Sequence, residues 1–167
     1  DPVGHFKKRT GSKEKIKREG MNGTNYGKDQ PKINIAVFAS GAGSNAEKLI
    51  QYFKGSELAT VALIVCNKPG AGVLAIAEKE GVPCLLIDKE NFFRGNGYIP
   101  YLRDRDIRFI VLAGFLWKIP PALVEAYPKR IVNIHPALLP KYGGKGMYGQ
   151  YVHEAVLNAG EVESGIT

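Results

Sequence analysis

The chain has 167 residues, of which 44% are hydrophobic and 23% are charged, and its formal net charge is +7. This length and composition are typical of one globular domain with a sizeable core, and they argue against a disordered or fibrous protein. No apolar run reaches the roughly 18 residues of a membrane-spanning helix, so we expect no membrane partner.

The positive charge is concentrated near the N-terminus. Residues 1–32 carry nine Lys and Arg against four Asp and Glu, which gives +5 there and leaves +2 for residues 33–167. A basic arm can contact nucleic acid or a membrane, but this one lacks the apolar segment of a secretory signal. We therefore expect residues 1–32 to be a disordered leader or an expression remnant. The nearly balanced residues 33–167 are the expected folded domain, with no nucleic-acid partner.

From residue 33, apolar runs rich in β-branched residues alternate with segments of helical periodicity. In chain order, the pattern predicts a strand at 33–39, a helix at 46–53, a strand at 60–66, a helix at 71–80 ending at Gly81, a strand at 84–87, a helix at 99–106, a strand at 109–113, a helix at 120–127, a strand at 131–134 and a helix at 151–158. The expected fold is α/β, with a doubly wound, mostly parallel sheet and helices on both faces. Ligands in such sheets bind beyond the carboxyl ends of the strands.

The first candidate site follows the first strand and consists of Gly41, Ala42, Gly43, Ser44 and Asn45. Glycines let the backbone approach a ligand closely, and free N–H groups at a helix start favour an anion, so this loop suits a phosphate group. Ser44 also has the spacing of a capping box with Glu47, three residues on. A plain tight turn is the alternative.

The same loop matches a relaxed dinucleotide fingerprint through Gly41, Gly43 and Ala46. That fingerprint also needs an acidic residue near the end of the second strand, where this chain has Cys66-Asn67-Lys68. The lack of a carboxylate argues against NAD as the ligand, whereas Lys68 could bind the extra phosphate of NADP. A nucleotide- or NADP-binding module is therefore retained as an alternative.

A second candidate site follows the fourth strand and Gly114. Its residues are Phe115, Leu116, Trp117, Lys118 and Ile119. The aromatic and aliphatic side chains could wall a pocket for a flat aromatic ligand. Simple core packing is the alternative that we favour for most of them, with Trp117 as the exception.

The two cysteines lie in apolar runs, without the spacing of metal ligands or of a disulfide framework. We expect Cys66 and Cys84 to be reduced and at least partly buried in a cytoplasmic protein.

The third candidate site is the segment from Asn133 to Pro140, which reads Asn-Ile-His-Pro-Ala-Leu-Leu-Pro. If the run before it is a strand, Asn133 and His135 point to the same face. A carboxamide can donate a hydrogen bond to a developing oxyanion, and an imidazole can transfer a proton near neutral pH. A buried structural histidine is the common alternative, but the glycine-rich stretch 141–147 beside the pair is suited to a lid.

The segment from Asn133 to Tyr142 closely resembles the active-site segment of the phosphoribosylglycinamide formyltransferases, a folate-dependent formyltransferase family. The resemblance extends over the other motifs in order and at matching spacing: residues 39–45, 66–67, 111–116 and 153–167. At position 136, the proline resembles the phosphoribosylglycinamide formyltransferases more than the methionyl-tRNA formyltransferases or the formyltetrahydrofolate hydrolases.

The resemblance implies a Rossmann-like formyltransferase fold and transfer of a formyl group from 10-formyltetrahydrofolate to the amine of glycinamide ribonucleotide in purine biosynthesis. It implies that Asn133 holds the tetrahedral oxyanion and that His135 passes a proton to the folate leaving group. It assigns residues 41–45 to the ribonucleotide phosphate and residues 115–119 to the folate. It also implies a cis peptide at Leu139–Pro140 and no metal, and it leaves a homodimer open.

In the resembled family, a third catalytic group is an aspartate beyond the strand that begins at Ser164-Gly165-Ile166-Thr167. We therefore expect this chain to lack the C-terminal part of the fold and to be inactive as given. Two other users of 10-formyltetrahydrofolate, a hydrolase and a tRNA formyltransferase, are the alternative activities. The nearly neutral folded part argues against tRNA as the acceptor.

Overall fold

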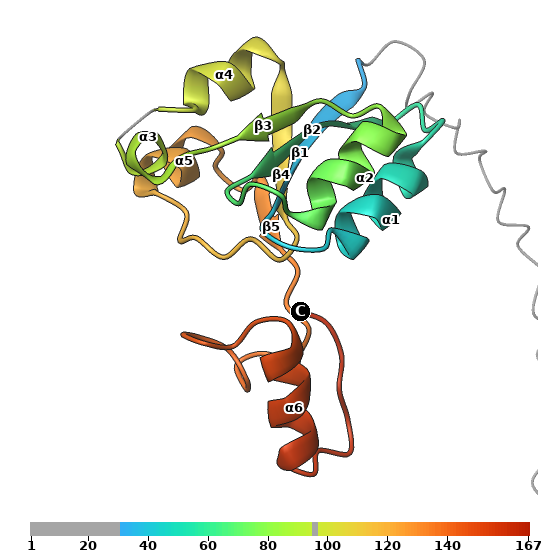
Figure 1. The fold of residues 1–167 in the computed structure, drawn as a ribbon, viewed down its shortest axis with the longest axis vertical. Helices are drawn as coiled ribbons and strands as arrows, with labels where there is room; N and C mark the ends of the chain where they lie inside the picture. Colours follow the sequence, from blue (N-terminus) through green and yellow to red (C-terminus); the bar gives the residue numbers. More distant parts are fainter. Residues whose placement is uncertain (1–30, 95–96) are drawn as a thin grey trace, which may run out of the picture.

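The computed structural model describes residues 31–94 and 97–167. Nearly all of the expected leader lies outside this range, so its disorder stays a prediction. The described strands form one parallel sheet in the order β3-β2-β1-β4-β5 (Figure 1). They are β1 (Ile33–Ala39), β2 (Ala59–Cys66), β3 (Cys84–Leu86), β4 (Ile107–Leu112) and β5 (Ile131–Asn133).

Helices cover both faces of the sheet. They are α1 (Ser44–Phe53), α2 (Gly72–Glu80), α3 (Lys89–Phe93), α4 (Ile99–Asp104), α5 (Pro121–Ala126) and α6 (Gln150–Asn158), of which the first five pack against the sheet. In β1, Ile35, Val37 and Ala39 pack in the core under α1 and α2, whereas Ala36 and Phe38 pack with α3, α4 and α5. The doubly wound arrangement is therefore confirmed. Among the described residues, no helix combines the length and apolar character that crossing a membrane requires.

The predicted elements form, and their ends agree within a few residues. β1 has the predicted bounds, and α2 ends where its terminal glycine predicts. Gly81 takes the left-handed conformation with φ 68°, and its N–H donates to the carbonyls of Ala77 and Glu78. This is the C-terminal helix cap that glycine forms most readily, because it has no Cβ to clash with the backbone.

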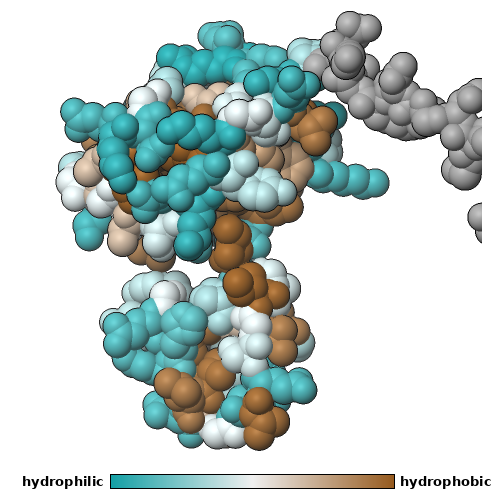
Figure 2. Space-filling model, turned by 90° about the vertical axis from the view of Figure 1, so that its right-hand side faces the viewer, coloured by the Kyte–Doolittle hydropathy of each residue, from teal (hydrophilic) through white to brown (hydrophobic). Residues whose placement is uncertain are grey.

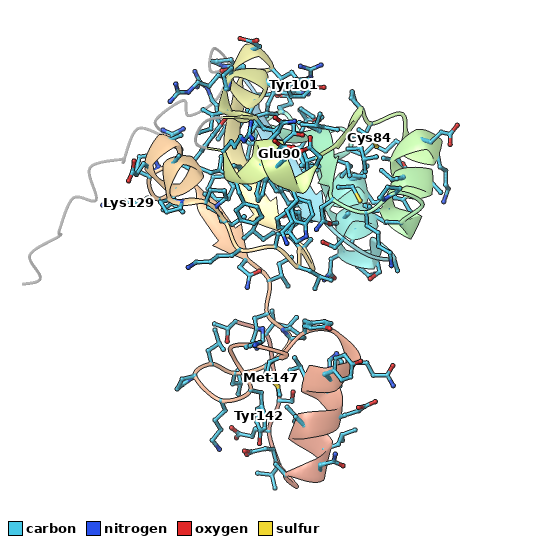
Figure 3. All side chains as sticks on the ribbon, turned by 60° about the vertical axis from the view of Figure 1, so that its left-hand side comes forward. Cys84, Glu90, Tyr101, Lys129, Tyr142 and Met147 are labelled. Atoms are coloured by element: carbon cyan, nitrogen blue, oxygen red, sulfur yellow. The ribbon has the colours of Figure 1, made fainter. Side chains whose placement is uncertain are left out.

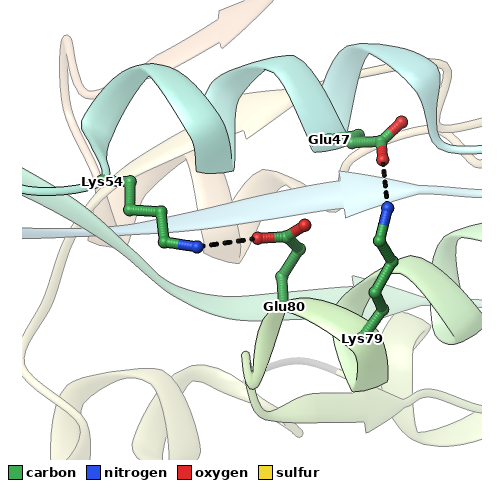
Figure 4. Close-up of polar contacts among 4 residues, drawn as sticks. All are labelled: Glu47, Lys54, Lys79 and Glu80. Carbon is green, nitrogen blue, oxygen red and sulfur yellow. Dashed lines mark hydrogen bonds and ion pairs between the residues drawn. The ribbon is translucent and has the colours of Figure 1, made fainter.

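The predicted capping box at the start of α1 is wrong. Gly43 precedes the helix, and no side chain bonds the first turn. Glu47 instead pairs with Lys79 of α2 at 3.3 Å, and Lys54 pairs with Glu80 at 3.5 Å (Figure 4). Because exposed ion pairs contribute at most about 1 kcal/mol each, the apolar contacts between α1, α2 and the sheet contribute most of the stability here.

The short helix α3 was not predicted. Asp88 caps it: its two carboxylate oxygens accept from the Asn91 backbone N–H at 2.8 Å and from the Asn91 side chain at 2.7 Å. The Tyr98 hydroxyl donates to the same carboxylate at 2.8 Å. Five residues are too few to show a helical period, so the aspartate three residues before an asparagine was the one local signal for this helix.

Residues 136–166, here called the α6 lobe, lie beyond the end of β5, below the sheet in Figure 1. The lobe buries a small core of its own, formed by Ala137, Val152 and Val156 with Tyr142 and Met147 packed against it (Figure 3). Figure 2 shows apolar side chains at its surface, and the exposed ones include Leu138, Leu139, Leu157, Val162 and Ile166. The lobe is joined to the sheet where Thr167 returns to pair with His135.

Both cysteines are free. Cys66 is buried at the end of β2, as expected, but Cys84 is exposed, so the prediction of burial is wrong for Cys84 (Figure 3). Cys84 begins β3, which is an edge strand and is covered less completely than the central strands.

We predict that Asp88 makes the stability of this fold depend on pH in the acid range. The hydrogen bonds from Asn91 and Tyr98 lower the pKa of Asp88 from 3.8 to about 2. A carboxyl group with a depressed pKa in the folded state stabilises the protein above its unfolded pKa, and this contribution is lost as the pH falls through the folded value. The melting temperature of Asp88→Asn should therefore lie below that of the wild type near pH 6, and the gap should close between about pH 4 and pH 2. A gap that stays constant over this range would contradict the prediction.

Candidate active site at the carboxyl ends of the strands

The glycine loop after β1 forms the N-terminal end of α1. Gly43 has φ 85°, and a Cβ there would lie 2.7 Å from Val73 of α2. The neighbouring Gly41 carbonyl accepts from the Val73 N–H at 3.1 Å, so the loop packs against the start of α2. The first intrahelical bond runs from the Glu47 N–H to the Gly43 carbonyl. The N–H groups of the first turn ahead of Glu47 are therefore free to hold an anion.

Ser40 ties the end of β1 to the end of β4. Ser40 is 4% exposed, and its hydroxyl accepts from the Leu116 N–H at 2.9 Å. Its own N–H donates to the Gly114 carbonyl at 3.2 Å. No local sequence pattern predicts this role, because Ser40 and Leu116 are 76 residues apart in the chain. Ser40 fixes the spacing between the first and second candidate sites, and the next five residues line a hollow at this edge of the sheet.

Two adjoining hollows lie at this edge of the sheet. The first, about 390 Å³, is lined by residues 40–45 together with Lys68, Leu116 and Tyr148. The second, about 600 Å³, is lined by Pro136 and His153 among others. Both share Ser44, Asn45, Gly114 and Gly149, so they form one continuous site between the sheet and the α6 lobe. These volumes are in the range of sites for small ligands.

The Asn133–His135 segment borders this site. Asn133 is exposed at the end of β5, and Ile134 continues the strand pairing by donating to the Leu112 carbonyl at 3.0 Å. His135 then exchanges two backbone hydrogen bonds with Thr167, both 2.9 Å. Ile134 and Pro136 line the second hollow, whereas Asn133 and His135, which alternate with them, do not.

His135 is 9% exposed, and its Nε2 lies 2.8 Å from the Tyr142 carbonyl oxygen. A carbonyl oxygen can only accept, so Nε2 carries a proton and donates it to this bond. The imidazole is thus held in one orientation beside the candidate site. Sequence reasoning missed Tyr142, because it acts on His135 through its backbone.

The loop after His135 is fixed by the Thr167 hydroxyl. This hydroxyl donates to the Ala137 carbonyl at 2.7 Å and accepts from the Leu139 N–H at 3.0 Å. The peptide bond between Leu139 and Pro140 is cis, as the resemblance implies.

The second candidate segment divides between the core and the site. Phe115, Trp117 and Ile119 pack in the core under α3, and the Trp117 ring lies 5.7 Å from the Phe92 ring and 5.9 Å from the Phe93 ring. The expectation that Trp117 stands apart from the core is therefore wrong. Leu116 and Lys118 are exposed, and Leu116 lines the first hollow. Within this segment, Leu116 and the backbone are thus the groups offered to a ligand.

The sequence matches the formyl transferase family over residues 33–167. It is similar to the chloroplastic phosphoribosylglycinamide formyltransferase of Arabidopsis thaliana, with 45% identity over 139 residues that cover 80% of this chain and 48% of that protein. The phosphoribosylglycinamide formyltransferase of Bacillus subtilis is 37% identical over 131 residues, which cover 75% of this chain and 67% of that protein. The chain thus spans about half the length of its plant relatives, 48% and 44%.

Solved structures confirm the fold. The crystal structure of glycinamide ribonucleotide transformylase 1 from Geobacillus kaustophilus superposes with a TM-score of 0.72 and 37% identity, over 81% of this chain and 72% of that chain. The phosphoribosylglycinamide formyltransferase structure from Bacillus halodurans superposes with a TM-score of 0.69 and 36% identity, over 80% of this chain and 69% of that chain. The described sheet and helices therefore have the Rossmann-like arrangement of these proteins.

We predict that the glycine loop tolerates alanine at one glycine and not at the other. Gly43→Ala should lower the free energy of unfolding by about 2–4 kcal/mol, because it adds a left-handed alanine and a clash with Val73. Gly41→Ala is the matched control: no atom lies within 4 Å of its added Cβ, so its effect should stay within about 0.5 kcal/mol. Urea unfolding measures both. Equal effects would show that the packing of α1 against α2 does not require Gly43.

Proposed function

The chain belongs to the formyl transferase family, and on that premise we propose that its protein transfers a formyl group from 10-formyltetrahydrofolate to the amine of glycinamide ribonucleotide in purine biosynthesis. The observation that carries the proposal is the continuous site between the glycine loop and the chain at Ile134 and Pro136, the two residues on either side of His135. An anion-binding helix start and a proton-transferring side chain at one edge of a sheet suit a phosphorylated substrate that carries a reactive amine.

The glycine loop is the proposed phosphate site. The free N–H groups of residues 44–46 and the dipole of α1 both favour an anion at the loop. Lys68 lines the same hollow and adds a positive charge. Glu47, the acidic side chain of the first turn, is paired with Lys79 at 3.3 Å, so its repulsion of a bound phosphate is reduced.

Asn133 and His135 are the proposed catalytic residues. When bound, 10-formyltetrahydrofolate supplies an electrophilic formyl carbon, to which the substrate amine forms a C–N bond while the carbonyl electron pair moves to oxygen. The Asn133 side-chain amide donates a hydrogen bond to that oxygen as its charge develops. His135 accepts a proton from the amine and returns one to the folate nitrogen, which leaves with the electron pair of its broken bond to the formyl carbon. The exposure of Asn133 leaves its amide free for this contact.

Residues 115–119 are the proposed folate segment. Because Phe115, Trp117 and Ile119 pack in the core, the contribution of this segment is its backbone groups and the side chain of Leu116. The aromatic packing holds that backbone rigid, which favours hydrogen bonds of fixed direction to a flat ring. A cytoplasmic location and a homodimer stay predictions, and the Arabidopsis relative is named as chloroplastic.

We predict that alanine substitution of either catalytic residue removes most formyl transfer by the full-length protein. His135→Ala should lower kcat by about 10²–10⁴-fold, and Asn133→Ala by about 10²–10³-fold, with smaller effects on KM. The assay follows formyl transfer to glycinamide ribonucleotide, with water and charged tRNA as competing acceptors.

Asn158→Ala is the matched control for Asn133→Ala, because Asn158 is exposed at the end of α6, away from both hollows. Its kcat should equal that of the wild type. Unchanged transfer by His135→Ala would contradict the mechanism. Transfer of the formyl group to tRNA or to water, and not to glycinamide ribonucleotide, would contradict the proposed acceptor.

A further inference from the structure

Tyr142 has an unusual backbone conformation next to the proposed catalytic histidine. Its φ is 56°, in the left-handed region that bulky residues rarely adopt. Its carbonyl oxygen accepts the hydrogen bond from His135 Nε2 at 2.8 Å. The direction of a carbonyl follows from the backbone torsion angles, so whatever holds Tyr142 in this conformation also sets the position of the imidazole.

The Tyr142 side chain is anchored at two places in the α6 lobe. Its ring packs against the small core that includes Ala137 and Val152. Its hydroxyl donates to Glu161 Oε1 at 2.8 Å, and Lys141 Nζ lies 2.8 Å from the same oxygen. The Glu161 N–H in turn donates to the Val156 carbonyl of α6 at 3.4 Å. The carboxylate therefore ties the histidine loop to the end of the last described helix.

The charges of this cluster favour one protonation pattern at neutral pH. The hydrogen bonds from Lys141 and Tyr142 lower the pKa of Glu161, so Glu161 stays a carboxylate and an acceptor. The bond to Glu161 raises the pKa of Tyr142, so the phenol keeps the proton that it donates. The contact between the two side chains thus has a fixed donor and a fixed acceptor.

We infer that Glu161 is a positioning residue for His135 and acts through Tyr142. The Glu161–Tyr142 bond holds the Tyr142 backbone in the left-handed region, and its carbonyl then fixes the imidazole in the Nε2–H tautomer. The other ring nitrogen, Nδ1, makes no hydrogen bond within residues 31–94 and 97–167. Nδ1 is therefore the nitrogen that accepts and returns the proton in the formyl transfer. This positioning role of Glu161 rests on the proposed function.

The test uses the full-length protein labelled with ¹⁵N, and it reads the His135 tautomer directly from long-range ¹H–¹⁵N correlations of the imidazole. In the wild type, Nε2 should carry the proton of the neutral ring. Tyr142→Phe removes only the hydroxyl, and Glu161→Gln removes only the charge. Both variants should show a new Nδ1–H population, a kcat lowered by roughly tenfold or more, and KM values within about twofold of the wild type.

Tyr52→Phe is the matched control, because Tyr52 is 79% exposed on α1 and far from His135 in the sequence. It should leave the tautomer and kcat unchanged. A wild-type tautomer and kcat in Tyr142→Phe would overturn the inference, whether or not Glu161→Gln folds. A changed tautomer in a protein that transfers no formyl group would support the positioning role and refute the proposed function, so the two failures are distinguishable.

Discussion

The site depends on the pairing of β1 with β4 at the centre of the sheet. Because the strand order is β3-β2-β1-β4-β5, the chain leaves β1 toward one side and β4 toward the other. The loops after these two strands therefore diverge, and the space between them is where α/β sheets bind ligands. Ser40 holds the two loops at a fixed separation through Gly114 and Leu116. The glycine loop, residues 115–119 and the Asn133–His135 segment are then all placed by neighbouring strands.

Much of this arrangement could be predicted from local patterns. Strands β1 and β2 are long and rich in β-branched residues, and Gly81 ends α2 as C-terminal glycines commonly do. The glycine loop was predicted because a strand, two glycines and a helix start follow one another along the chain. These features belong to short segments, and their meaning does not depend on distant residues.

The errors and omissions arise where a distant contact decides the outcome. The Ser44–Glu47 spacing suits a capping box, but Glu47 bonds Lys79 of the next helix instead. Trp117 packs against Phe92 and Phe93 of α3, and α3 is too short to be predicted from a helical pattern. The His135 tautomer is set by the backbone carbonyl of Tyr142, seven residues away, and no pattern of side chains predicts such a contact.

We propose that the glycine loop and the histidine segment bind one molecule together. The most direct test of this joint binding is titration of the full-length protein with glycinamide ribonucleotide, monitored by the backbone amides of Ser44 and Asn45 and the imidazole of His135. Both sets of resonances should shift with the same dissociation constant, and inorganic phosphate should shift only the amides. If the ribonucleotide moves the amides and leaves His135 unchanged at saturation, the two segments do not form one substrate site.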